Sequence, residues 1–231
     1  MSTIEIESGE YAPIAETFPS ASFPLAYEIL NSLTHGIGVA LSIAALFMLI
    51  VQAANSAPES IRAACVFGYS LFGISLIVLY SASTVYHALP PSRLKGYFCV
   101  LDHCAIYLLI AGSYSAFSLA TLYGPIGWSL FAANWTLAII GIVQYVVLRD
   151  KYKWVSLTLY LFMGWMVVFA IKPLMATIDA LPLIMLLAGG LSYTIGCVFF
   201  VMHKIWWAHP VWHLFVLGGS VCQFLAAYWM F

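Results

Sequence analysis

The chain has 231 residues, of which 64% are hydrophobic and only 7% are charged, with a formal net charge of -1 and a mean hydropathy of +0.99. Soluble domains carry about a quarter charged residues, so this composition leaves too little polar surface for a water-soluble fold and predicts an integral membrane protein. The near-neutral charge and the lack of a basic stripe exclude nucleic acid as a partner.

The segment before the first apolar run, residues 1–23, is predicted to be a short acidic tail. It holds four glutamates and no Lys or Arg. A secretory signal starts with a positive region followed by an apolar core, so this segment is not expected to be one. We therefore divide the chain into a tail, residues 1–23, and a membrane domain, residues 24–231.

Seven apolar runs follow, separated by short polar connections. A helix that crosses the hydrocarbon core of a bilayer needs about 20 predominantly apolar residues. The predicted spans cover about residues 29–53, 63–86, 101–122, 127–148, 154–171, 181–202 and 210–231. The sequence therefore predicts an all-α integral membrane protein, a bundle of seven transmembrane helices.

The basic residues of the connections predict how the bundle is oriented. Those after the first, third and fifth runs hold only Arg62 and Lys172. The connections after the second, fourth and sixth runs hold Arg93, Lys95, Arg149, Lys151, Lys153 and Lys204. Because basic connections stay in the cytoplasm, we expect a cytoplasmic N-terminus and a C-terminus outside.

Three histidines and one aspartate occupy the ends of predicted spans. Because successive spans alternate in direction, these ends all lie on the predicted cytoplasmic side. His209 and His213 lie one turn apart at the start of the seventh run, His87 closes the second, and Asp102 opens the third. Three histidines with an open fourth position suit a catalytic zinc ion, which makes water acidic enough to furnish hydroxide near neutral pH. Asp102 is then expected to be a base or a water-orienting group. Ser83, one turn before His87, faces the same way.

A plainer interpretation is that these are interfacial histidines, as we interpret His103 and His203. A lone HxxxH pair is a weak motif, and this one lacks the glutamate of the HExxH proteases. Ionisable residues at membrane spans are costly, however, and are functional by default. The convergence of four such residues therefore favours a metal site.

A second polar group stands at the start of the first run. Glu28, Asn31 and His35 share roughly one helical face, and Thr34 is beside them. One interpretation is an interfacial helix start, with Glu28 near the positive end of the helix dipole. The other is support for the metal site or contact with lipid headgroups.

The ordered motifs resemble those of a known family. They are Glu28-x-x-Asn31-x-x-Thr34-His35-Gly36, Ser83-x-x-x-His87, Leu101-Asp102-His103-Cys104-Ala105-Ile106-Tyr107 and His209-x-x-x-His213. With them the chain resembles the hemolysin III family, within the wider progestin and adipoQ receptor group (the CREST superfamily), from about Pro24 to Phe231. The resemblance is strongest to bacterial members.

The resemblance implies a seven-helix bundle with its N-terminus inside. Receptor members hold zinc through histidines matching His87, His209 and His213, with a water bridged to an aspartate matching Asp102, and Ser83 matches the serine of the same motif. Those receptors look like ceramide-type amide hydrolases. Bacterial members are associated with membrane lipid and fluidity homeostasis, which implies a multi-pass protein of the bacterial plasma (inner) membrane.

The sequence and the resemblance are compatible with two functions. The first is a zinc-dependent hydrolase that acts on an amide or ester of a membrane lipid, so that membrane lipids are the expected partners. The alternative is a non-enzymatic membrane sensor or regulator in which zinc is structural. A retinal protein is disfavoured, because the seventh run contains no lysine that could form a Schiff base.

Overall fold

The computed structural model describes residues 25–148, 153–202 and 204–231, and over these ranges the secondary structure is helical. The acidic tail predicted for residues 1–23 lies outside the described residues. The elements in chain order are α1 (Leu25–Ser56), α2 (Arg62–Ala88), α3 (Arg93–Thr121), α4 (Pro125–Leu148), α5 (Lys153–Gly164), the 3₁₀ helix η2 (Met166–Ala170), α6 (Ile171–Thr177), α7 (Ala180–Val201) and α8 (Ala208–Tyr228).

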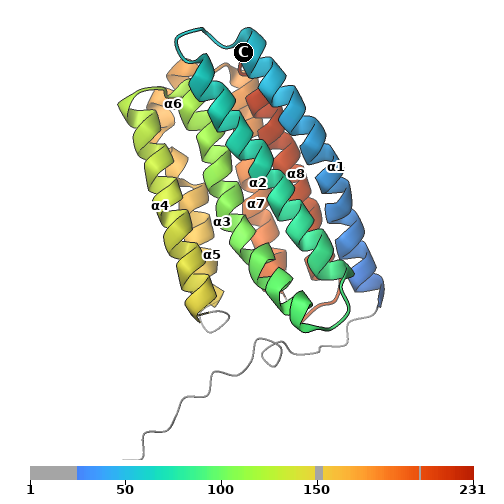
Figure 1. Ribbon diagram of the computed structural model, residues 1–231. Helices are drawn as coiled ribbons and strands as arrows, with labels where there is room; N and C mark the ends of the chain where they lie inside the picture. Colours follow the sequence, from blue (N-terminus) through green and yellow to red (C-terminus); the bar gives the residue numbers. More distant parts are fainter. Residues whose placement is uncertain (1–24, 149–152, 203) are drawn as a thin grey trace, which may run out of the picture.

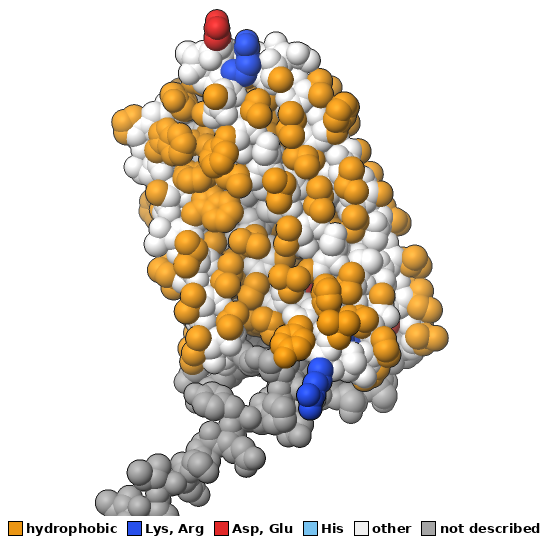
Figure 2. Space-filling view, in the orientation of Figure 1, with side chains coloured by type: hydrophobic (Ala, Val, Ile, Leu, Met, Phe, Trp, Pro, Cys, Tyr) orange, Lys and Arg blue, Asp and Glu red, His pale blue; other side chains and the backbone are white. Residues whose placement is uncertain are grey.

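The described helices form seven spans that are long and apolar enough to cross a membrane, and α5, η2 and α6 together make the fifth. The predicted all-α protein with seven long apolar helices is therefore confirmed. Apolar side chains cover the flank of the bundle, and the charged side chains visible in this view lie near its two ends (Figure 2). This distribution is that expected for a protein surrounded by hydrocarbon.

Successive spans run antiparallel (Figure 1). The main packing pairs are α1 with α2 and α8, α2 with α3, α3 with α4, and α7 with α8. Consequently α1, α3 and α8 begin, and α2 ends, at the same end of the bundle. We call it the lower end, after its place in Figure 1. At Gly38 a Cβ would lie 2.6 Å from the ring of Tyr80, so α1 approaches α2 closely only because this residue is glycine.

The third helix begins earlier than predicted, at Arg93 rather than near Leu101. Ser92 caps it, because its Oγ accepts a hydrogen bond from the backbone N–H of Lys95 at 3.2 Å. Hydropathy marks only the part of a helix that suits hydrocarbon, and here the first turn carries the charged residues Arg93 and Lys95. Asp102 therefore does not open the helix but lies about two and a half turns into it.

The fifth span also differs from the prediction, which ended it at Lys172 and Pro173. The chain instead leaves α5, passes through η2 and resumes as α6 up to Thr177. Proline is compatible with the first turn of a helix, where its missing N–H is not needed. The hydroxyl of Tyr114 donates to the carbonyl of Gly164 at 2.9 Å and accepts from the N–H of Val167 at 2.7 Å. Backbone groups released by the break are thus satisfied by α3.

Candidate metal centre

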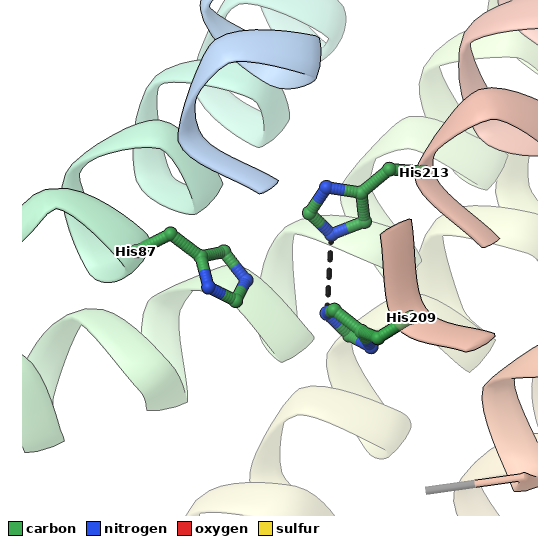
Figure 3. Close-up of side chains that lie close together, drawn as sticks. All are labelled: His87, His209 and His213. Carbon is green, nitrogen blue, oxygen red and sulfur yellow. Dashed lines mark hydrogen bonds between the residues drawn. The ribbon is translucent and has the colours of Figure 1, made fainter. Parts of the chain in front are cut away.

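Three imidazoles from two helices converge at the lower end. His87 is the next-to-last residue of α2, and His209 and His213 lie in the first two turns of α8. Among the described residues they form the one group that could hold a metal ion, with ligand atoms all within 4.8 Å of one another. The three rings point toward a common space (Figure 3).

The distance between the two histidines of α8 suits a tetrahedral metal ion. The Nε2 atoms of His209 and His213 are 3.1 Å apart. Two nitrogens of a tetrahedral zinc site, each about 2.0–2.1 Å from the ion, lie about 3.3 Å apart. The Nε2 atom of His87 is buried and has no hydrogen-bond partner among the described residues. A buried imidazole nitrogen without a partner is costly, and a metal ion would satisfy it.

The opposite nitrogen of His87 is held by a carboxylate of α1. His87 Nδ1 lies 2.7 Å from Glu28 Oε2, and Lys95 Nζ lies 2.9 Å from Glu28 Oε1. Lys95 Nζ also donates to the carbonyl of Leu89 at 2.9 Å. Helices α1, α2 and α3 are therefore joined beside the site by one ion-pair network.

The same helix, α1, lies against the other side of the site. His213 Nδ1 is 3.3 Å from the carbonyl oxygen of Asn31 and 3.3 Å from Thr34 Oγ1. The ring of His35 stacks on that of His213, with centroids 3.6 Å apart and planes inclined by 8°. Asn31, Thr34 and His35 thus surround His213, although none belongs to the three-histidine group.

The remaining two predicted site residues lie close by. Asp102 of α3 is half-buried and near enough to His87 to interact with it electrostatically. Ser83 lies one turn before His87 in α2, and its buried hydroxyl makes no hydrogen bond with a described residue. The catalytic roles expected for Asp102 and Ser83 stay predictions.

A cavity begins beside the histidines and runs between α3, α5, α7 and α8. Asp102, His209 and His213 line it at the lower end, and Gln223 lines it farther up α8. Between them the wall is mainly apolar. It includes Ile106, Leu109, Phe117, Leu161, Leu186 and Val216.

Sequence reasoning missed two residues near the site. Lys95 contributes to the predicted orientation of the bundle, but nothing in the sequence signals its pairing with Glu28 on a different helix. His103 was interpreted as interfacial, yet it lines the cavity, and its Nδ1 lies 2.9 Å from the carbonyl oxygen of Cys99. His203 lies outside the described residues.

Most of this chain is similar in sequence to known proteins. The family model described as Haemolysin-III related matches residues 23–224. Hemolysin-3 of Bacillus cereus is 44% identical over 197 residues, 85% of this chain and 88% of that protein. The Hemolysin-3 homolog of Bacillus subtilis (strain 168) is 40% identical over 202 residues, 87% and 93% of the two chains. Human Monocyte to macrophage differentiation factor is 32% identical over 164 residues, 68% and 67% of the two chains. The chain therefore belongs to the Haemolysin-III related family.

Proposed function

We propose that this protein is a zinc-dependent hydrolase that cleaves an amide or ester bond of a membrane lipid. It would thereby contribute to membrane lipid and fluidity homeostasis in the bacterial plasma (inner) membrane. The observation that carries the proposal is the three-histidine group beside a long apolar cavity. Imidazole ligands suit zinc, and three protein ligands leave a position for the reacting group.

The extent of the cavity along α8 and its mainly apolar wall support an acyl-chain site. His209 and Gln223 both line it and are separated along α8 by about 21 Å, at 1.5 Å per residue. The lining between these two residues is mainly apolar, so a hydrocarbon chain would replace water there favourably. A fatty acyl chain in this cavity would bring its carbonyl group to the histidines.

The proposed reaction adds water across the bond that joins the acyl group to the rest of the lipid. A bound zinc ion would supply Lewis acidity, polarising the carbonyl and acidifying water. Asp102 would accept the proton of the attacking water and return it to the leaving nitrogen or oxygen. Ser83 is near enough to Asp102 to interact with its carboxylate, and a hydrogen bond from its hydroxyl would orient that carboxylate. The products are a fatty acid and an amine or an alcohol, so atoms and charge balance.

The proposed orientation places this chemistry at the cytoplasmic leaflet. The lower end of the bundle carries Arg93, Lys95 and Lys204, whereas Arg62 and Lys172 lie toward the opposite end. An excess of basic residues marks the cytoplasmic face. The substrate bond would then lie at headgroup depth in the inner leaflet.

Lipid-product analysis of the purified protein tests the proposal. Incubation with ceramides and phospholipids should release fatty acid, and Asp102→Asn should abolish this release while zinc stays bound. Asp179→Asn, an exposed aspartate at the start of α7, is the matched control and should leave release unchanged. Fatty-acid release that survives both Asp102→Asn and zinc removal would rule out the mechanism.

The alternative is a non-enzymatic sensor or regulator in which zinc holds the bundle together. It is favoured by the network that joins α1, α2, α3 and α8 around the histidines. In that case zinc removal would lower the melting temperature, and no lipid would yield a product under any condition. Measured turnover would reject this alternative.

A further inference from the structure

We propose that Glu28 is a positioning residue of the metal centre: its carboxylate, fixed by Lys95, holds the His87 ring so that Nε2 faces the metal ion. The proposal rests on the metal site of the proposed function but not on hydrolysis. According to this proposal, the ion pair between Glu28 of α1 and Lys95 of α3 increases the affinity of the site for a metal ion.

The hydrogen-bond partners of Glu28 determine which nitrogen of His87 carries the proton. An ionised carboxylate only accepts hydrogen bonds. Because one oxygen of Glu28 accepts from the ammonium of Lys95 at 2.9 Å, the other can only accept from His87 Nδ1, at 2.7 Å. Nδ1 therefore carries the hydrogen. The buried, unpartnered Nε2 is left with the lone pair that a metal ion requires.

The Glu28 carboxylate is also held in a fixed position. Lys95 is itself anchored, because its Nζ donates to the carbonyl of Leu89 and lies 5.0 Å above the ring of Tyr86. The carboxylate of Glu28 is thus held between His87 and the anchored Lys95, which restricts its motion. A metal-binding histidine whose other nitrogen donates to a carboxylate gains both a fixed ring orientation and a more basic ligand atom.

Helix α1 also supplies hydrogen-bond acceptors for the Nδ1 atom of His213. The hydroxyl of Thr34 donates to the carbonyl of Leu30 at 2.8 Å, so toward His213 Nδ1 its oxygen acts as an acceptor. The carbonyl of Asn31 is a second acceptor for the same Nδ1. Nδ1 of His213 must therefore be the donor and Nε2 the free lone pair. Helix α1 supplies none of the three ligands, yet it orients two of them.

Zinc affinity of the full chain in detergent tests the proposal, measured by competition with a chelating dye. Glu28→Gln keeps an oxygen acceptor but loses the charge, and should bind zinc about 10-fold more weakly. Glu28→Ala loses both and should bind up to about 100-fold more weakly. Lys95→Met should also weaken binding. The control is Glu59→Gln, an exposed glutamate at the opposite end of the bundle, which should bind as the wild type does.

The rival explanation is that Glu28 only ties α1 to its neighbours. It predicts a lower melting temperature of the zinc-free protein but wild-type zinc affinity in the folded variants, and that result overturns the proposal. If Glu28→Ala does not fold, the nearly isosteric Glu28→Gln decides. A wild type that binds no zinc overturns both proposals, whereas zinc binding that depends on Glu28 without any lipid turnover supports this one and removes only the hydrolase.

Discussion

His209 and His213 hold their Nε2 atoms 3.1 Å apart across one turn of α8. Residues four apart share a helical face, so the sequence spacing alone brings the two rings together. Two lone pairs at this distance repel each other unless a proton or a cation lies between them. Because the Nδ1 atom of His213 already faces two acceptors, its Nε2 atom carries a lone pair, which accepts a hydrogen bond from His209 Nε2 or, together with it, could bind a metal ion.

The cavity can be filled without touching the histidines. Gly190 lines it, and a Cβ at this position would meet no atom within 4 Å. We expect Gly190→Leu to reduce turnover of long-chain lipids at least about 10-fold while zinc content stays unchanged, because the new side chain occupies space meant for the acyl chain. Leucine also favours a helix more than glycine does, so the fold should be retained.

The measurement is the ratio of long-chain to short-chain turnover, with zinc content determined on the same samples. Ala44→Leu, which adds the same side chain to the exposed face of α1, is the matched control. An unchanged ratio in Gly190→Leu would show that acyl chains do not enter this cavity.

Tyr114 is expected to hold the broken fifth span in place. Tyr114→Phe removes the acceptor for the Val167 N–H and the donor for the Gly164 carbonyl. Unsatisfied polar groups away from water cost about 1–3 kcal/mol each, so the melting temperature in detergent should fall by several degrees. Tyr97→Phe, at an exposed tyrosine of α3, should leave it unchanged. Equal melting temperatures for the two variants would contradict this role.

Cysteine labelling of intact cells tests the proposed orientation. Asn55→Cys, in the last turn of α1, should react with a membrane-impermeant maleimide from outside, and Arg93→Cys only after the cells are opened. Both positions are exposed, and the wild type reports the background from the five native cysteines. The reverse pattern would place the histidines near the outer leaflet.

The number and order of the spans could be predicted because a helix that crosses a membrane needs a long apolar run, and the described part of the chain contains seven such spans. Helix ends could not, because they depend on local hydrogen bonds. The Ser92 cap starts α3 eight residues before the apolar run. The break after α5 depends on Tyr114, a residue of another helix that no pattern within the fifth run reveals.

The three histidines could be predicted to lie close together because successive spans alternate in direction. The end of α2 and the start of α8 therefore lie on the same side of the membrane. Their partners were harder to predict. The spacing of Glu28, Asn31 and His35 indicated a shared face, but nothing indicated that Glu28 binds His87 rather than solvent or lipid headgroups. Pairing between Lys95 and Glu28 depends on how α1 and α3 approach each other, which is a property of the packed bundle.

Zinc content of the purified protein, measured by elemental analysis, tests the metal centre most directly. The wild type should carry about one zinc ion per chain, and the double variant His209→Ala with His213→Ala should carry almost none. His103→Gln, at a histidine of the same end outside the three-histidine group, should keep its zinc. A wild type free of divalent metal, or a double variant that keeps its full zinc content, would contradict a metal site at these histidines.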